Sequence, residues 1–259
     1  MSFRRKLACV ISNVSAGLSW LGSERAGLRV LMYHSVGKRA FGDVRGLFSV
    51  TPENFKAQVT LLAEHYRDNV VELSESGISE SERRLAITFD DGYLDNLEVA
   101  APILHDLSLP FTVFVTSEFV RKGLEGFLSI SALRDLSTLP QVKIGAHGAN
   151  HIALTNCHDK TLQDELVSSK CFLEDALGKE VSAIAYPYGA VDRRVKIAAQ
   201  AAGYRLGTCS FAGLNQPGRD SLLLARTEVV SLDSDRVFKQ KLRGDWDWYR
   251  WRKADPQTL

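Results

Sequence analysis

Strand-like and helix-like segments alternate along this 259-residue chain from Leu28 onward, and few architectures are compatible with such an alternation. Short apolar runs rich in β-branched residues indicate strands, whereas apolar residues at helical spacing indicate helices. The expected strands span residues 28–36, 70–73, 85–89, 111–115, 142–146, 183–186, 204–209 and 224–230. One helix is expected to begin after Thr51, and others to span residues 94–107, 130–136, 160–177, 193–202 and 233–242. Seven or eight β-then-α units in a chain of this length predict a single α/β domain with a barrel-like sheet.

The composition is that of an ordinary globular protein, with 45% hydrophobic and 24% charged residues. The formal net charge of +1 gives no support for a nucleic-acid partner, which would normally require a basic face. The four cysteines are scattered without a Cys-x-x-Cys pair, which argues against a thiolate zinc site or a disulfide framework. This cysteine usage fits a reducing compartment, and we expect the protein to be cytoplasmic.

Both ends of the chain differ in character from the rest. Residues 1–27 begin with a basic cluster at 4–6 and a short apolar run at 7–11, which Ser12 and Asn13 interrupt. This pattern favours an amphipathic helix that touches a membrane or packs on the domain, with a signal peptide as the alternative. Residues 244–259 are aromatic and basic, and we expect them either to pack on the barrel or to contact a membrane or partner. The barrel domain is therefore expected to span residues 28–243.

Polar side chains follow several of the predicted strands at the point where each strand ends. The strand at 85–89 stops at Asp90 and Asp91, whose neighbouring carboxylates disfavour each other's ionisation unless a cation or proton lies between them. His34, His147 and Tyr188 also lie at predicted strand ends. Because the carboxyl ends of barrel strands meet on one face, these side chains are expected to converge there on an active site.

His147 and His151 are four residues apart, so one helical turn would place both imidazoles on the same side. Two histidines and one carboxylate can hold a metal ion and leave positions open for water and substrate. Gly148 occupies the place where the metalloprotease helix motif carries its glutamate base. The base must then come from elsewhere, and the second carboxylate of the 90–91 pair is available.

Three ordered motifs resemble those of the polysaccharide deacetylases, the de-N-acetylases of carbohydrate esterase family four. The first motif is the run TFDDGY at 88–93 with Asp95 and Asn96 after it, the second is HGANH at 147–151, and the third is YPYG at 186–189. The similarity extends from about Leu31 to Glu228. This resemblance implies a deformed (β/α) barrel of roughly seven units that removes an acetyl group from an N-acetylated sugar in a metal-dependent reaction.

The resemblance also implies a role for each motif residue. Asp91, His147 and His151 would hold a divalent metal, usually Zn²⁺, with Co²⁺, Ni²⁺ or Fe²⁺ as alternatives. Asp90 would be the general base. The backbone N–H of Tyr188, in the third motif with its neighbours Pro187 and Gly189, would stabilise the tetrahedral oxyanion or bind substrate.

The proton donor departs from the commonest family pattern, in which a late Leu-x-His motif supplies the acid. No histidine follows His158 in this chain. The run MYHSV at 32–36 instead resembles the early motif of the exopolysaccharide branch, which implies that His34 is the general acid. Before the motifs are considered, a histidine within a buried strand is equally compatible with a structural role.

Two further departures concern the support of the site. Gly148 replaces the usual serine or threonine of the second motif, and Ala185 stands where an arginine often precedes the third motif. Arg226, on the last predicted strand, is expected either to supply a cation near Asp90 or to form an ordinary surface salt bridge.

Three alternative functions stay open at this point. The chain could bind a glycan without cleaving it, or hydrolyse another small N-acyl group, such as formyl, on a sugar. It could also be a glycosidase that uses Asp90 and Asp91, although adjacent strand residues point to opposite faces and are poorly placed for that reaction. For a cytoplasmic enzyme, the expected substrate is a precursor of a surface polysaccharide such as O-antigen or exopolysaccharide.

Overall fold

A computed structural model describes residues 25–248 and 254–258, and its centre is one parallel sheet. The seven strands lie in the order β8-β7-β6-β5-β4-β1-β9. Every neighbouring pair in this sheet is parallel. The strands are β1 (Gly27–Tyr33), β4 (Arg83–Phe89), β5 (Phe111–Val115), β6 (Val142–Ala146), β7 (Ala183–Ala185), β8 (Leu206–Thr208) and β9 (Arg226–Glu228).

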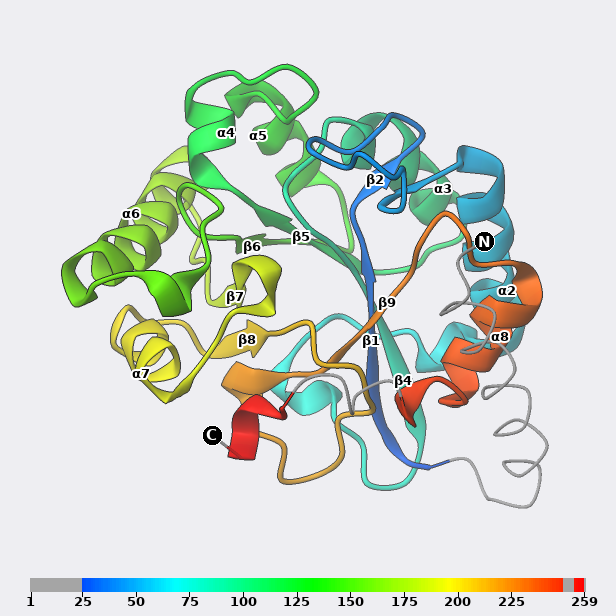
Figure 1. Cartoon of the computed structure of the whole chain (residues 1–259). Helices are drawn as coiled ribbons and strands as arrows, with labels where there is room; N and C mark the ends of the chain where they lie inside the picture. The colour runs from blue at the N-terminus through cyan, green and yellow to red at the C-terminus, as the bar shows by residue number, and fades with distance from the viewer. Residues whose placement is uncertain (1–24, 249–253, 259) are drawn as a thin grey trace.

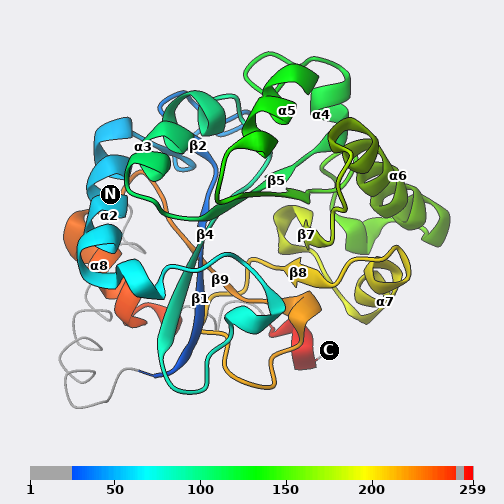
Figure 2. The same cartoon turned by 180° about the vertical axis from the view of Figure 1, so that it is seen from behind.

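Helices surround the sheet on its outer side. In Figures 1 and 2, α2, α3 and α8 gather on one side of the barrel, α6 and α7 on the other, and α4 and α5 between them. This arrangement follows from the parallel pairing, because each parallel connection must cross back over the sheet. The helices are α2 (Pro52–Tyr66), α3 (Ala101–Asp106), α4 (Ser117–Arg121), α5 (Ile130–Thr138), α6 (Asp159–Leu177), α7 (Arg193–Ala201) and α8 (Asp235–Arg243).

The sheet curls into a nearly closed barrel. Its two edge strands approach each other through a parallel bridge between Thr208 and Leu224, the residue two positions before β9. Hydrogen bonds from the Cys209 N–H to the Leu224 carbonyl (2.9 Å) and from the Leu224 N–H to the Gly207 carbonyl (2.8 Å) support this contact. The predicted fold class, a single deformed (β/α) barrel with about seven units, is confirmed.

The barrel interior holds a small apolar core of its own. Leu28, Val30, Phe114 and Leu224 are almost fully buried in it, whereas the larger core lies between the strands and the surrounding helices. Gly145 on β6 illustrates how closely the interior packs, because a Cβ atom there would lie 2.5 Å from the Phe114 ring. A barrel this narrow is filled by side chains, so the site must lie at one of its ends.

Some predicted elements differ from the structure. The segment 70–73 was expected to be a strand but forms only an isolated bridge between Val70 and Leu85. Residues 204–209 and 224–230 contain strands of three residues each rather than the longer strands predicted. Two short strands, β2 (Ser35–Val36) and β3 (Ser49–Val50), pair with each other beside the main sheet and were not predicted as a pair.

The described part of the C-terminal segment packs against the barrel. Asp247 forms a two-point ion pair with Arg29 of β1 (2.8 and 2.9 Å), and Nη1 of Arg219 donates to both carboxylate oxygens of Asp255 (2.8 and 2.7 Å). The expectation that this segment packs is therefore met for its described residues, whereas Tyr249 and Trp251 lie outside them. The predicted N-terminal helix and the boundary at residue 27 concern a segment that is mostly outside the described residues, so the domain division stays a prediction. Among the described helices, none is long and apolar enough to cross a membrane.

Asp247→Ala is expected to lower the free energy of unfolding by about 3 kcal/mol, because it leaves the charge of Arg29 buried without its carboxylate. Arg29 is 1% exposed and Asp247 is 26% exposed, which places the cost at the lower end of the range for buried pairs. Urea unfolding measures this loss. Glu180→Ala provides the control, because its pair with Arg205 is more than half exposed and should contribute far less to stability than the buried pair.

Candidate active site

The carboxyl ends of four strands bring the predicted site residues to one end of the barrel. Asp90 directly follows β4, His147 follows β6 and His34 follows β1. Tyr188 lies in a short 3-10 turn two residues after β7 ends. The convergence predicted from the strand assignments is therefore present in the structure.

Each of the three motifs contains a residue with a left-handed backbone. The φ angles are 75° at Asp91, 56° at His151 and 59° at Tyr188. Residues other than glycine adopt this conformation at a cost of about 1–3 kcal/mol, and such strain concentrates at functional sites. At Asp91 the unusual backbone changes the direction of the chain immediately after β4, so that both carboxylates of the 90–91 pair approach the same histidine.

Asp91, His147 and His151 form a compact cluster. The Oδ1 atom of Asp91 lies 3.3 Å from Nε2 of His147 and 3.2 Å from Nε2 of His151. One ligand atom from each residue lies within 4.8 Å of the others. Asp91 Oδ1 is buried and forms no hydrogen bond within the described part of the chain. Three lone-pair donors that converge in this way, one of them a buried oxygen without a hydrogen bond, fit a divalent metal site with two nitrogens and one oxygen.

The orientation of His147 suits metal binding. Its Nδ1 lies 2.8 Å from the carbonyl oxygen of Ala185, which can only accept, so Nδ1 carries the proton and Nε2 presents its lone pair to Asp91. Burial alone would lower the pKa of His147, but the carboxylates of Asp90 and Asp91 outweigh burial and raise the pKa. Burial would likewise raise the pKa of Asp91, but the two imidazoles hold that pKa well below its ordinary range. The cluster thus favours a positive charge between its members.

The loop between the two histidines is not the helical turn that the sequence suggested. Residues 147–153 are irregular, and the loop is shaped instead by the buried carboxylate of Glu165 on α6. This carboxylate accepts from the N–H groups of Ala149 and Asn150 (both 2.9 Å) and from the Asn150 side-chain amide (2.6 Å). Gly148 has a φ of 71°, and a Cβ atom there would lie 3.3 Å from Glu165 Oε2. Sequence reasoning missed Glu165, because one glutamate in a long helix carries no signal.

Glu165→Gln is expected to weaken metal binding by about 10- to 100-fold, the usual effect of losing a group that orients metal ligands. The amide can no longer accept all three hydrogen bonds, so the loop that carries His151 should loosen. Activity should recover at high zinc concentration, which distinguishes weaker metal binding from damage to the reaction itself. Asp164→Asn, on the exposed side of the same helix, is the control and should bind zinc as the parent does.

Asp90 is held by a buried arginine. Arg226 on β9 donates to both carboxylate oxygens of Asp90, at 2.6 and 2.7 Å, and is 1% exposed. Burial alone would raise the pKa of Asp90, but Arg226 and then His147 outweigh it and hold the pKa below its ordinary value. Of the two expectations for Arg226, the structure supports the cation beside Asp90 and not the surface salt bridge. Arg226 is buried, and both of its terminal nitrogens are bound to Asp90.

Arg226→Met is expected to move the acid limb of the kcat/KM profile to higher pH. Without the guanidinium, the burial of Asp90 is less strongly opposed, so its pKa rises and its carboxylate is protonated at a pH where the parent is still ionised. A pH series of kcat/KM measures the shift, and Arg226→Lys should move the limb less because it keeps a charge. An acid limb unchanged in the folded methionine variant would contradict the control of Asp90 by Arg226.

His34 is half-buried at the rim of the site. Its ring centroid lies 4.7 Å from that of Phe48, and its Nδ1 is buried without a hydrogen bond among the described residues. Asn96 donates to the His34 carbonyl at 2.9 Å, and Ser35 donates to Asp95 Oδ2 at 2.5 Å. Consecutive residues of the first motif thus fix the backbone on both sides of His34, a support that sequence reasoning did not foresee.

The third motif forms another part of the site wall. The side chain of Tyr188 is 63% exposed, and its ring centroid lies 4.6 Å from that of His151. Gly189 has a φ of 66°, and a Cβ atom there would lie 2.4 Å from the Ser210 nitrogen, so the turn requires glycine. Pro187 is buried and would contact a side chain at position 148.

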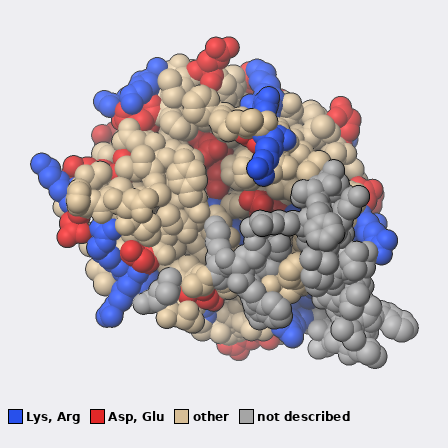
Figure 3. All heavy atoms as spheres, viewed as in Figure 1, with Lys and Arg blue, Asp and Glu red and all other residues tan. Residues whose placement is uncertain are grey.

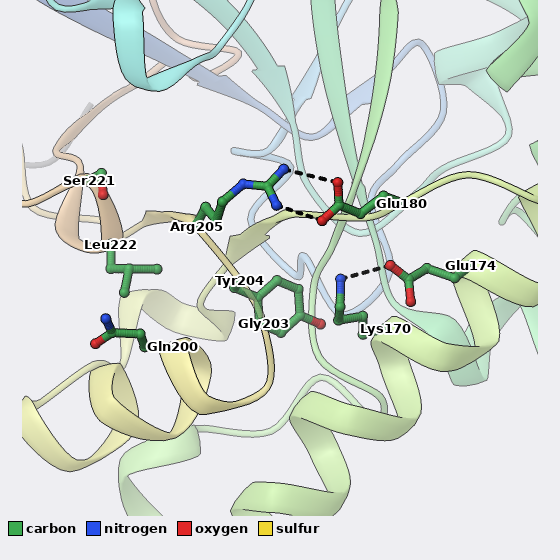
Figure 4. A pocket seen from close by; sticks show the side chains of 9 residues that line it. All are labelled: Lys170, Glu174, Glu180, Gln200, Gly203, Tyr204, Arg205, Ser221 and Leu222. Atoms are coloured by element: carbon green, nitrogen blue, oxygen red, sulfur yellow. Dashed lines mark hydrogen bonds and ion pairs between the residues drawn. The ribbon is translucent and has the colours of Figure 1, made fainter.

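The candidate active site is separate from a second pocket of the molecule. Figure 3 shows acidic side chains inside a hollow near the middle of the front face, with neutral side chains to its left and lysine or arginine side chains to its right. A separate pocket of about 610 Å³ is drawn in Figure 4. Its charged residues already pair with each other, Lys170 with Glu174 at 2.7 Å and Arg205 with Glu180 at 2.6 Å. This pocket lies at the residues that precede β7 and β8, which is the opposite end of the barrel from the predicted site.

Comparisons with known proteins agree with this geometry. The family model described as "Polysaccharide deacetylase" matches residues 77–207. The chain belongs to the polysaccharide deacetylase family. It is 24% identical over 217 residues to YxkH of Bacillus subtilis (strain 168), a protein whose name places it among the polysaccharide deacetylases, covering 82% of this chain and 75% of YxkH.

Solved structures share the fold. The Streptococcus pyogenes deacetylase PplD, determined in complex with acetate, has a TM-score of 0.72 and 22% identity, with 84% of this chain and 99% of PplD covered. BC0361, a polysaccharide deacetylase from Bacillus cereus, has a TM-score of 0.72 and 26% identity, with 83% of this chain and 69% of BC0361 covered.

Membership of this family confirms the predicted enzyme class. Polysaccharide deacetylases are carbohydrate de-N-acetylases, hydrolases that cleave an amide carbon–nitrogen bond, and they are metal-dependent. The matched residues 77–207 include all three motifs but neither His34 nor Arg226. The placement in the exopolysaccharide branch, the metal's identity and the roles of individual residues stay predictions.

Proposed function

We propose that this protein removes an N-acetyl group from an amino sugar of a bacterial surface polysaccharide or of its precursor. The observation that carries the proposal is the Asp91–His147–His151 cluster, whose three ligand atoms converge within 4.8 Å directly beside Asp90. His147 Nε2 lies 3.3 Å from Asp91 and 4.0 Å from Asp90, so the groups proposed to bind a metal and to move a proton share one small space.

In this proposal, Asp91, His147 and His151 would hold a divalent metal, and two imidazoles with one carboxylate are typical of catalytic Zn²⁺. When bound, such a metal would polarise the amide carbonyl and the attacking water. The remaining steps fall to side chains and backbone groups of this chain. Because metal binding and proton transfer are separate tasks, the adjacent aspartates can have different roles, Asp91 as a metal ligand and Asp90 as the base.

Asp90 takes a proton from water. Arg226 occupies one lone-pair direction on each Asp90 oxygen and keeps the carboxylate ionised, while the remaining lone pairs stay available to accept. His34, directly after β1, donates a proton to the departing amine. The Tyr188 backbone N–H, held at a left-handed turn, donates to the developing oxyanion.

The geometry weighs against the glycosidase alternative. Asp90 and Asp91 both approach the same His147 nitrogen, and Asp90 is already bound by Arg226 at both oxygens. A glycosidase needs two carboxyl groups that flank the scissile bond, one of them protonated. Here the pKa of each carboxyl group is held low, which favours the ionised form and opposes that role.

Mass spectrometry of candidate sugars incubated with zinc-loaded protein tests the proposal. A loss of about 42 mass units identifies an acetyl group and a loss of about 28 a formyl group, the remaining alternative for a metal-dependent amide hydrolase. N-acetylated and N-formylated forms of the same oligosaccharide provide a matched pair of substrates. No mass loss from any acylated glycan would support the glycan-binding alternative and overturn the proposal.

A further inference from the structure

The loop at residues 37–48, between β2 and β3, exposes apolar side chains. Phe41 is 71% exposed and Val44 is 85% exposed. Leu232, 53% exposed, belongs to a neighbouring segment in which Ser231 donates to the Leu47 carbonyl (2.9 Å) and the Gly46 carbonyl (2.6 Å). Three large apolar side chains are therefore exposed on adjoining segments.

The acidic side chain and several backbone groups of this loop form hydrogen bonds within the loop. Asp43 is 8% exposed and accepts from the N–H groups of Arg45 (3.1 Å) and Phe48 (2.6 Å). The Arg39 guanidinium donates to the Asp43 carbonyl at 2.7 Å and also to the Val44 carbonyl. The loop is thus held in one shape by internal hydrogen bonds, with phenylalanine and valine on the outside. A loop adapted only to water would not expose both of these apolar side chains.

The exposed charges of the loop have one sign. Lys38, Arg39 and Arg45 are exposed, whereas the only acidic residue of the loop, Asp43, is buried. Apolar side chains that can enter the acyl boundary, surrounded by basic side chains that attract phosphate headgroups, are typical of proteins that dock on anionic membranes. We propose that the 37–48 loop docks this protein on an anionic lipid bilayer.

The same loop is attached to the rim of the active site. The ring of Phe41 lies 6.3 Å from that of Phe119, and the ring of Phe119 lies 6.1 Å from that of His151. The Phe41 N–H donates to the Tyr93 hydroxyl at 3.0 Å. Figure 1 draws the loop beside β2, and in Figure 3 lysine or arginine side chains border the acidic hollow in this region. A bilayer bound by the loop would therefore lie close to the site.

The position of the loop at the rim of the active site also indicates the class of substrate. This inference rests on the proposed function. An enzyme whose active-site rim contacts the bilayer acts most readily on sugars held at the same surface. The acylated sugar is then part of a glycan attached to a membrane lipid, rather than a free nucleotide sugar or a released polymer.

An environment-sensitive dye on Val44→Cys, in the full-length chain with its other accessible cysteines replaced by serine, tests the contact directly. Ile197→Cys is the matched control, because Ile197 is also an exposed apolar residue, 53% exposed, but lies on α7 on another side of the barrel. With vesicles that contain anionic lipid, the emission at position 44 should shift to the blue and the emission at position 197 should not. Val44→Asp should weaken vesicle binding about tenfold or more, because it places a charge where an apolar group is buried.

The outcomes are informative whether or not catalysis is detected, because dye emission and vesicle binding do not require turnover. Unchanged emission at position 44 while the protein sediments with vesicles would assign the membrane contact to another segment and overturn the proposal. Equal shifts at positions 44 and 197, or equal binding to vesicles of purely zwitterionic lipid, would also overturn it. Activity on a soluble oligosaccharide should be the same in Val44→Asp as in the parent.

Discussion

Asp90→Asn is expected to lower acetate release by about 10²- to 10⁴-fold, the range that a positioned general base contributes. The amide has the shape of the carboxylate but cannot accept the proton of the attacking water. Zinc content should stay unchanged, because the proposed ligands are Asp91, His147 and His151. Acetate release and bound zinc are measured on the same preparation.

An unfolding measurement and a control variant show whether a loss of activity comes from the missing base. Asparagine places an amide opposite Arg226, so the free energy of unfolding is measured to show that the variant is folded. Asp235→Asn, at the exposed start of α8, is the control for a lost carboxylate and should have the parent's activity. An Asp90→Asn variant that is folded and as active as the parent would refute the assignment of the base.

His147→Ala and His151→Ala should each weaken zinc binding by more than the roughly 100-fold upper value for supporting residues, because each removes a ligand itself. The effect should be larger at His147, which is 2% exposed and has its proton fixed by the Ala185 carbonyl. Calorimetric titration with zinc measures both affinities, and acetate release should fall to background.

His158→Ala is the matched control for these variants. His158 precedes α6, is exposed and lies outside the cluster, so its removal should leave zinc affinity unchanged. A His147→Ala variant that binds zinc as tightly as the parent would contradict the assignment of the metal ligands.

Strand periodicity is the reason that both the fold and the grouping of the site residues could be predicted from the sequence. In a parallel barrel the strand periodicity determines which residues lie at carboxyl ends, so Asp90, His147 and Tyr188 could be placed together from strand assignments alone. The strand at 111–115 and the strand at 142–146 have the predicted bounds. Short apolar runs predicted strands less reliably, because the 70–73 segment forms one bridge instead of a strand.

The supporting contacts could not be predicted, because they join residues far apart in sequence through common residue types. Arg226 and Asp90 are 136 positions apart, and the sequence left both a buried and a surface role open for Arg226. Glu165 shapes the histidine loop from a helix in which Asp159, Asp164 and Asp175 are exposed. The loop conformation itself depends on these bonds and on the left-handed backbone at Gly148 and His151 rather than on the helical turn that the spacing suggested.

Acetate released from an N-acetylated glycan, measured with zinc-loaded protein, after chelation and after zinc is restored, tests the central claim most directly. Release should disappear with the chelator and return with zinc, without any increase in reducing sugar, because the amide is cleaved and the glycosidic bond is not. Release that persists without metal, or that appears as reducing sugar instead of acetate, would contradict a metal-dependent de-N-acetylase.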